Sequence, residues 1–301
     1  MTESSPVQLP LVPHCNERSV VYLGDAYDVL SQLPAEAYQV AVTSPPYWGL
    51  RDYGTEGQIG SEENLDDYIQ NLVAVFSELR RVLKPDGTLW LNLGDCYTSG
   101  GRTWRAPDKK NPARAMSYRA PTPPGLKAKD LIGVPWRVAF ALQANGWYLR
   151  SEIIWHKPNA HPESVKDRPT RAHETLFLLS KSEKYYYNYR AIMEQGANGH
   201  LRNKRTVWSI PTEPVREAHF ATFPPALIEP CILAGSRPGD YVIDPFFGSG
   251  TTGLVAARLG RCFVGIELNP EYLEIARRRL ARHAVGFDSI TEFATPAIEH
   301  G

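Results

Sequence analysis

The chain has 301 residues, 43% of them apolar, and its 33 basic residues balance its 33 acidic residues to a net charge of zero. This length and composition allow one large core, or a core with a smaller lobe, and exclude a chain that is disordered over most of its length. The first residues show no basic start before an apolar run, and no uncharged apolar stretch of about 18 residues occurs. We therefore expect a cytoplasmic protein without a membrane partner.

The charges are unevenly distributed along the chain. Residues 98–205 hold 20 Lys and Arg against 8 Asp and Glu, a net of +12, so the rest of the chain carries −12. A basic segment in an otherwise acidic protein is typical of a surface that binds a phosphate backbone, because neutralised phosphates release counterions. The alternative is an ordinary solvated surface.

The first third of the chain, after an N-terminal tail over 1–18, has the pattern of alternating strands and helices. Short apolar runs rich in Val and Tyr indicate strands, and apolar residues at helical spacing indicate a helix that Lys84-Pro85-Asp86-Gly87 ends. The predicted elements of residues 19–97 are strands over 19–25 and 38–43, a helix over 65–83 and a strand over 88–93.

The middle of the chain contains two irregular, basic stretches. Residues 98–130 are rich in Gly, Pro, Arg and Lys and have no period, which predicts a loop insertion. A helix over 131–145 and a strand over 148–155 make 131–156 part of the core. The second irregular stretch covers 157–218, and in it Tyr185-Tyr186-Tyr187 favours a strand edge over a platform for stacking bases.

The last third returns to regular alternation, and a C-terminal tail over 286–301 follows it. The predicted elements of residues 219–285 are a helix over 224–234, a strand over 240–244, a helix over 250–259, a strand over 262–267 and a helix over 270–283. Strands that alternate with helices predict an α/β fold with a mostly parallel, doubly wound sheet.

The most specific motif follows the strand over 240–244. In Asp244-Pro245-Phe246-Phe247-Gly248-Ser249-Gly250-Thr251-Thr252 the two glycines let the backbone approach a ligand, and the hydroxyl residues can cap the next helix. Glu267 ends the following strand and is placed to accept both ribose hydroxyls of a nucleoside. The loop lacks the G-x-G-x-x-G and P-loop patterns, so a nucleoside bearing an amino acid fits better than a dinucleotide or a triphosphate.

This loop resembles the adenosylmethionine motif of the amino-DNA methyltransferases, whose F-x-G-x-G pattern is met by Phe246, Gly248 and Gly250. Leu23-Gly24-Asp25 resembles the family's element for the adenine ring, and His219–Pro224 resembles the segment that precedes the cofactor loop. The resemblance implies a Rossmann-like methyltransferase fold and S-adenosyl-L-methionine as cofactor. The residues expected to bind it are Asp25, Phe223, Asp244, Pro245, Phe246, Gly248, Ser249, Gly250, Thr251 and Glu267.

Ser44-Pro45-Pro46-Tyr47 follows the strand over 38–43, at the edge where ligands of such sheets bind. An exocyclic amino nitrogen is a poor nucleophile, because its lone pair is delocalised into the ring. Ser44 Oγ and the Pro45 carbonyl are placed to accept its two hydrogens and so direct the lone pair at the methyl group. Tyr47, with Trp48, would stack on a base rotated out of the duplex.

The catalytic tetrapeptide precedes the cofactor loop, an order similar to the permuted beta class, in which the region between them recognises the target. Family members with Ser-Pro-Pro-Tyr are mostly cytosine-N4 enzymes, so we expect methylation of cytosine N4, with adenine N6 as the alternative. An RNA amino-methyltransferase, a non-catalytic DNA-binding subunit and a dinucleotide-dependent oxidoreductase are the more distant alternatives. The resemblance also implies a restriction-modification context and is compatible with a cognate endonuclease and with a homodimer.

Double-stranded DNA is the expected partner, and 157–218 is the expected target-recognition region. Arginine and lysine contact phosphates, and arginine also pairs with guanine edges. Trp155-His156-Lys157-Pro158-Asn159 resembles the family's aromatic motif that packs against the flipped base. The residues expected to contact DNA are Trp48, Arg102, Arg105, Lys109, Lys110, Trp155, Lys157, Arg168, Arg171, Arg202, Lys204 and Arg205.

The four cysteines form no C-x-x-C pair, so we predict free thiols, no metal site and no disulfide framework. Pro230-Cys231 needs separate consideration, because cytosine-C5 methyltransferases use a Pro-Cys nucleophile. In this chain it lies before the cofactor loop in an apolar, helical stretch, so Cys231 is expected to be a core thiol.

Overall fold

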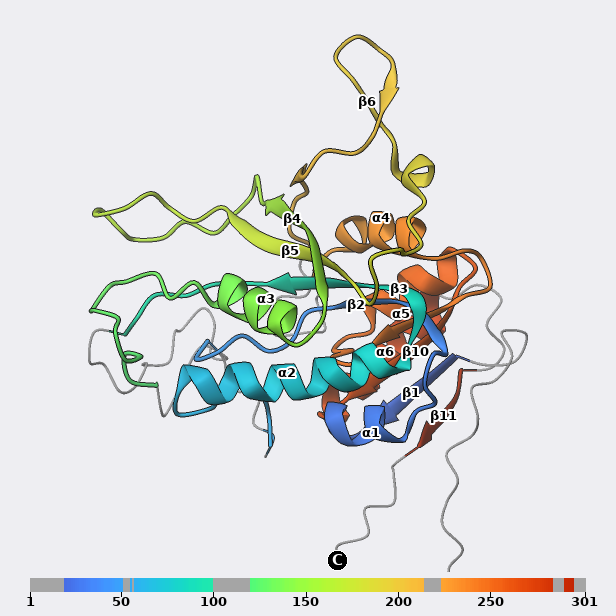
Figure 1. Cartoon of the computed structure of the whole chain (residues 1–301), viewed down its shortest axis with the longest axis horizontal. Coiled ribbons are helices and arrows are strands. Elements are labelled where there is room, and N and C mark those ends of the chain that lie inside the picture. Colours follow the sequence, from blue (N-terminus) through green and yellow to red (C-terminus); the bar gives the residue numbers. More distant parts are fainter. Residues whose placement is uncertain are drawn as a thin grey trace, which may run out of the picture.

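One sheet forms the centre of the molecule (Figure 1). The computed structural model describes residues 19–50, 55, 57–99, 120–213, 223–283 and 290–294. Among these residues the sheet has nine strands, in the order β11 (Ile290–Ala294), β1 (Ser19–Leu23), β10 (Cys262–Glu267), β9 (Tyr241–Asp244), β2 (Tyr38–Thr43), β3 (Leu83–Leu93), β5 (His173–Ser180), β4 (Tyr148–His156) and β8 (Val207–Ser209). Neighbours are parallel except at β5, which is antiparallel to both β3 and β4. The predicted Rossmann-like, mostly parallel sheet is confirmed.

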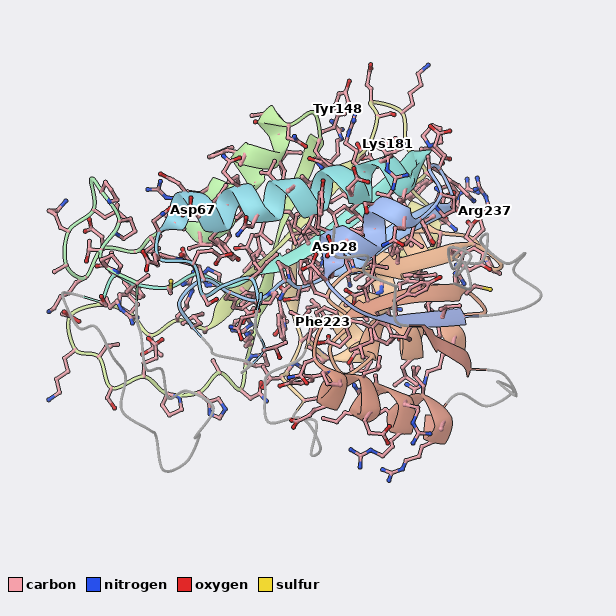
Figure 2. All side chains as sticks on the ribbon, turned by 90° about the horizontal axis from the view of Figure 1, so that it is seen from below. Asp28, Asp67, Tyr148, Lys181, Phe223 and Arg237 are labelled. Atoms are coloured by element: carbon pink, nitrogen blue, oxygen red, sulfur yellow. The ribbon has the colours of Figure 1, made fainter. Side chains whose placement is uncertain are left out.

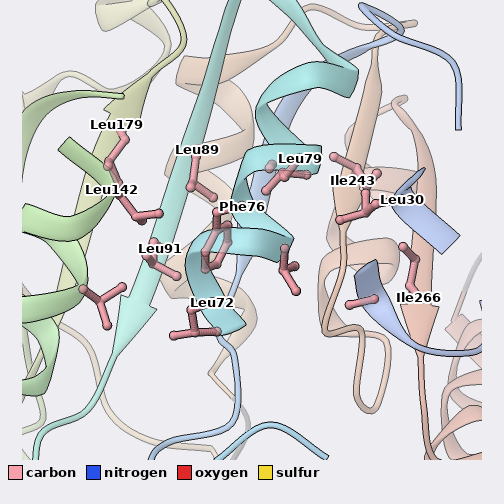
Figure 3. Close-up of a cluster of buried hydrophobic side chains, with 14 of the residues drawn as sticks. Leu30, Leu72, Phe76, Leu79, Leu89, Leu91, Leu142, Leu179, Ile243 and Ile266 are labelled. Carbon is pink, nitrogen blue, oxygen red and sulfur yellow. The ribbon is translucent and has the colours of Figure 1, made fainter. Parts of the chain in front are cut away.

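Helices cover both faces of the sheet, as a doubly wound fold requires. One face carries α1 (Ala26–Gln32), α2 (Leu65–Val82) and α3 (Val134–Ala144), and the other carries α4 (Pro225–Gly235), α5 (Thr251–Arg258) and α6 (Pro270–His283). Strand residues supply the two cores alternately: Leu89 and Leu91 of β3 pack with α2, whereas Trp90 belongs to the opposite core. Figure 3 shows Leu72 and Phe76 of α2 beside these leucines. None of the described helices is long and apolar enough to cross a membrane.

Helix α2 begins and ends where local contacts satisfy its backbone. The side chain of Asn64, which precedes it, accepts a hydrogen bond from Asp67 N at 2.8 Å in the first turn. Figure 2 labels Asp67 near this end of the helix. Residues 84–87 end the helix as predicted, but they already belong to β3, which begins at Leu83 instead of residue 88. Lys84 Nζ pairs with Asp240 Oδ1 at 3.0 Å and so links the starts of β3 and β9.

Two segments outside the predicted core of the fold join the sheet. Strand β11 lies in the expected tail, 286–301, and pairs with β1. Strand β5 lies in the expected target-recognition region, 157–218, yet it occupies the sheet between β3 and β4. Tyr185-Tyr186-Tyr187 form no strand edge: they follow β5 in a loop, where the Tyr187 ring stacks on Trp90 at 6.4 Å.

A short arm, residues 189–206, begins beside α4 and then extends away from the sheet in Figure 1. It contains the 3-10 helix η2 (Tyr189–Ile192) and the two-stranded hairpin β6 (Glu194–Gln195) and β7 (Leu201–Arg202). Leu201 of the hairpin is 63% exposed, whereas Ile192 of η2 is buried. The hairpin of the arm therefore presents its surface to the surroundings and contributes little to the core.

The cysteines agree only in part with the sequence analysis. Cys231 is fully buried in α4, and burial raises the pKa of its thiol well above the usual value, as expected for a core thiol. Cys96 is also free. Cys262 is bonded in a disulfide, which corrects the expectation of four free thiols.

Candidate active site

The predicted cofactor and catalytic residues meet at one edge of the sheet. Strands β1, β10, β9 and β2 are neighbours and parallel, so their carboxyl ends lie side by side. Asp25 follows β1, Glu267 ends β10, Asp244 ends β9, and Ser44 follows β2. The structure thus brings together groups about 200 positions apart in the chain, at the edge where open α/β sheets bind ligands.

The loop between β9 and α5 has the backbone that a closely bound ligand needs. Gly248 and Gly250 have φ angles of 53° and 80°, in the left-handed region that favours glycine. A Cβ on Gly250 would lie 3.0 Å from Ala276 Cβ, so this part of the loop packs directly on α6. A Cβ on Gly248 would come no closer than 4.0 Å, to Phe246 O, so the loop is open on that side.

Glu267 faces this loop. Its Oε2 accepts a hydrogen bond from Gly248 N at 2.7 Å, and its Oε1 accepts one from Asn269 N at 2.8 Å. Burial raises the pKa of Glu267 to about 7, although these backbone donors act to lower it. A carboxylate that burial still destabilises would gain from further donors, and the two hydroxyls of a ribose supply such donors. The residues present therefore fit the nucleoside of the expected cofactor.

Asp244 holds the loop to the catalytic strand. Its Oδ1 accepts hydrogen bonds from Thr43 Oγ1 at 2.6 Å and Phe246 N at 3.1 Å, and its Oδ2 accepts one from Thr252 Oγ1 at 2.6 Å. The residue is 1% exposed, and burial raises its pKa to about 6. All of these hydrogen bonds come from other residues of the protein, so Asp244 holds the cofactor loop in its shape.

Two further residues of the loop are turned towards α6. Ser249 and Thr251 are buried, and Arg279 Nη1 donates to Ser249 O at 2.6 Å, to Ser249 Oγ at 2.5 Å and to Thr251 Oγ1 at 3.1 Å. Arg279 lies in α6 and was not predicted as a site residue. These contacts explain how the glycine turn keeps its shape while one side of it stays open.

The remaining predicted cofactor residues surround the loop. Phe246 is half-buried and packs edge-on against Phe76 at 6.3 Å, and Pro245 is buried. Phe223 is half-buried just before α4. Asp25 caps α1 by accepting hydrogen bonds from Tyr27 N at 2.8 Å and Asp28 N at 3.1 Å.

The catalytic tetrapeptide leaves the sheet directly after Thr43. Pro45 is buried, and the Pro46 carbonyl accepts a hydrogen bond from Tyr68 Oη of α2 at 2.9 Å, which fixes the path of the turn. The Tyr47 ring lies against Gly94, where an added Cβ would come within 2.4 Å of Tyr47 Cε2. Ser44 Oγ lies 3.2 Å from Tyr47 Oη.

Three residues that sequence reasoning missed or placed elsewhere complete this part of the site. Asn92 of β3 donates through Nδ2 to Tyr47 Oη at 2.9 Å and to Ser44 Oγ at 3.4 Å. Glu174 of β5 accepts hydrogen bonds from Tyr47 Oη and Asn92 Nδ2, both at 2.9 Å, and pairs with Lys157 Nζ. Lys157 is predicted to contact DNA, but its side chain is only 17% exposed and lies beside this carboxylate.

Two tryptophans expected at the DNA surface are in the core. Trp48 is 3% exposed and donates through Nε1 to Glu62 O at 3.0 Å. Trp155 is 2% exposed and donates through Nε1 to Ile210 O at 2.8 Å, with Lys157 Nζ 4.2 Å from its ring centroid. Their burial corrects the expectation that these rings face a flipped base.

The basic residues expected to bind DNA fall into separate groups. Arg168 pairs with Glu163 at 2.7 Å and lies over the Tyr97 ring at 3.9 Å, and Arg171 lies 3.6 Å from Asp95. On the arm, Arg202 pairs with Glu194, Lys204 lies over the Trp208 ring, and Arg205 is exposed. Arg102, Arg105, Lys109 and Lys110 lie outside the described residues.

Comparison with known proteins shows the family of the chain. Residues 38–278 match the model of the N6/N4 DNA methylase family. The chain is 63% identical to the Type II methyltransferase M.Cfr9I of Citrobacter freundii over 87% of both chains. It is 61% identical to M.SmaI of Serratia marcescens over 87% of this chain and 90% of that one.

Solved structures share the fold. PvuII DNA methyltransferase (cytosine-N4-specific) superposes with a TM-score of 0.66 over 87% of this chain and 86% of that one, at 24% identity. TTHA0409 of Thermus thermophilus, in complex with S-adenosyl-L-methionine, superposes with a TM-score of 0.62 over 89% and 97%, at 28% identity. The chain therefore belongs to the DNA methylase family, with S-adenosyl-L-methionine as its methyl donor.

Proposed function

We propose that this DNA methyltransferase modifies the exocyclic N4 of cytosine at specific sites in double-stranded DNA. The observation that carries the proposal is the position of Ser44-Pro45-Pro46-Tyr47 at the end of β2, bonded through Thr43 to Asp244 of the cofactor loop at 2.6 Å. The bound cofactor supplies an electrophilic methyl group on a sulfonium.

The chain's own residues would supply orientation and hydrogen-bond acceptors. Glu267 and the open side of Gly248 hold the nucleoside, and Asp244 fixes the loop against the catalytic strand. Ser44 Oγ and the Pro45 carbonyl accept the two amino hydrogens, which directs the nitrogen lone pair at the methyl group. Tyr47 stacks on the base that has left the duplex.

The choice of cytosine rests on the serine at the first position of the tetrapeptide, which the family resemblance associates with N4 transfer. The two relatives above 60% identity are named Type II methyltransferases. Their names support modification at a defined site within a restriction-modification system, which would include a cognate endonuclease.

We also propose that the DNA lies across two groups of basic residues. Arg168 and Arg171 are near the catalytic end of the sheet, whereas Arg202, Lys204 and Arg205 lie on the arm. The projecting arm suits base reading in a groove, because it extends away from the sheet (Figure 1).

The test is nucleoside mass spectrometry on DNA from cells that express the wild-type chain or the Ser44→Ala, Pro45→Ala double variant. The host should lack modification enzymes of its own, and the variant's melting temperature should match that of the wild type. N4-methylcytosine in the wild-type DNA and its absence with the variant is the expected result. N6-methyladenine would keep the chemistry and overturn the choice of base, and no methylated base at all would overturn the proposal.

A further inference from the structure

Glu174 is the centre of the polar contacts around the catalytic tetrapeptide. Its Oε2 accepts hydrogen bonds from Tyr47 Oη and Asn92 Nδ2, both at 2.9 Å, and its Oε1 pairs with Lys157 Nζ. The Glu174 side chain is 19% exposed. Its three partners come from three segments: the loop after β2, strand β3 and the end of β4. This carboxylate therefore links these three segments beside the tetrapeptide.

The surroundings keep Glu174 ionised. Burial acts to raise its pKa, but the Lys157 charge and the donors from Lys157, Asn92 and Tyr47 outweigh burial and lower the pKa below its ordinary value. An ionised carboxylate can only accept hydrogen bonds. The hydrogen of the Tyr47 hydroxyl must therefore point towards Glu174.

The direction of the hydrogen bond from Tyr47 to Glu174 determines the direction of the hydrogen bond between Ser44 and Tyr47. Ser44 Oγ and Tyr47 Oη are 3.2 Å apart, and either oxygen alone could be the donor. Because Tyr47 donates to Glu174, its oxygen is left to accept from Ser44. Asn92 Nδ2 is a donor and lies close to both oxygens, and it favours the same assignment of donor and acceptor. Ser44 thus directs its hydrogen to Tyr47 and keeps an oxygen lone pair free.

We propose that Glu174 is a positioning residue of methyl transfer, which acts through Tyr47 to hold Ser44 as the hydrogen-bond acceptor for the target amino group. The inference rests on the proposed function and extends its catalytic machinery beyond the tetrapeptide. Lys157 supports it by balancing the charge of Glu174. Without the carboxylate, the two hydroxyls can exchange donor and acceptor roles, and Ser44 then presents a hydrogen to the amino group in part of the molecules.

The experiment measures single-turnover transfer from tritium-labelled S-adenosyl-L-methionine to unmethylated plasmid DNA by the full chain. Glu174→Gln keeps the shape of the side chain and can turn a donor towards Tyr47. We expect transfer at least tenfold slower, with dissociation constants for cofactor and DNA within twofold of the wild type. Tyr47→Phe keeps the ring, removes the hydroxyl and should slow transfer similarly. The combined variant should be no slower than either single variant, because both interrupt one chain of hydrogen bonds.

Two controls separate positioning from a purely structural role. Glu183→Gln removes an exposed carboxylate beyond β5 and should leave transfer unchanged. The charge-balanced Lys157→Met, Glu174→Gln variant leaves no unpaired ammonium and should still be slow.

The outcomes distinguish the inference from the function on which it rests. Recovery of the wild-type rate in the charge-balanced variant would reduce Glu174 to an ion-pair partner and overturn the inference. Additive losses in the Glu174→Gln, Tyr47→Phe combination, or an unchanged rate in Glu174→Gln, would also overturn it. A wild-type chain that methylates no base would instead overturn the proposed function itself.

Discussion

The cofactor side and the catalytic side of the site are held together by different kinds of hydrogen bond. On the cofactor side, at the end of β10, Glu267 accepts from the backbone amides of Gly248 and Asn269, which are 19 and two residues away along the chain. On the catalytic side, at the ends of β2, β3 and β5, side chains contact side chains. Tyr47 and Asn92 lie 127 and 82 residues from Glu174. Local backbone contacts therefore shape the expected cofactor site, whereas tertiary structure assembles the expected catalytic groups.

The largest effect is expected from a substitution on the cofactor side that introduces a steric overlap. In Gly265→Ala the new Cβ would lie 2.4 Å from Phe247 Cδ2, and this ring already packs against Phe263 at 5.8 Å. We expect a loss of about 3 kcal/mol in the free energy of unfolding and loss of cofactor binding, as Phe247 moves and carries the glycine turn with it. Urea unfolding and calorimetric titration measure the two effects.

The smaller ring-free side chain of Phe247→Leu should relieve the overlap when combined with Gly265→Ala. Partial recovery of cofactor binding in that combined variant is the expected result. Unimpaired binding in Gly265→Ala alone would contradict the packing argument.

A second effect comes from the buried carboxylates of the same side. Burial raises the pKa of Glu267 to about 7 and that of Asp244 to about 6 in the folded protein. A raised pKa favours the protonated form, so this stabilisation is complete below the unfolded pKa and is lost as the pH rises through the folded pKa. The free energy of unfolding of the cofactor-free protein should fall by about 3 kcal/mol between pH 4.5 and 7.5 on account of Glu267.

Denaturant unfolding across this pH range tests the assignment. Glu267→Gln should flatten the dependence, while Glu271→Gln, which changes an exposed residue of α6, should leave it as in the wild type. Affinity for S-adenosyl-L-methionine should rise over the same pH range, because the ionised Glu267 is the better acceptor for ribose hydroxyls. Stability that rises towards pH 7.5 in the wild type and not in Glu267→Gln would refute a raised pKa for Glu267.

The smallest effect concerns the arm and should leave the cofactor side untouched. Arg205→Ala removes one exposed charge, so DNA binding should weaken a few-fold, and the slope of log affinity against log salt should decrease by about 0.9. Cofactor affinity should not change. Lys184→Ala removes an equal, exposed charge after β5, away from the arm, and fluorescence anisotropy should show no such loss. Equal losses of DNA affinity in both variants would mean that affinity depends only on the total charge of the protein, and not on the arm.

The contrast between the two sides explains what could be predicted from the sequence. Gly248, Gly250 and Glu267 lie in one strand-turn-helix unit and the strand that follows it, so their pattern is visible over a few tens of residues. Asn92 and Glu174 meet only because β3 pairs with β5 in one register, with Asn92 opposite Leu176. Sequence periodicity indicates strands but not their neighbours, and so it could not bring these two residues together.

Some signals of the missed residues were present all the same. Asn92 interrupts the apolar run Leu89–Leu93, and Glu174 stands two positions before the apolar run Leu176–Leu179. A polar residue inside a buried strand needs partners and so marks a site. Tryptophan gives no comparable signal, because Trp48 and Trp155 suit both a core and a stacking surface. Both rings are buried in the core.

The junction between β2 and β9 has a consequence for the architecture of such enzymes. Thr43 and Asp244 hold the two functional halves together across a sheet contact, although 201 positions separate them along the chain. The contact between the two halves therefore depends on the pairing of β2 with β9, and not on how far apart the halves lie along the chain.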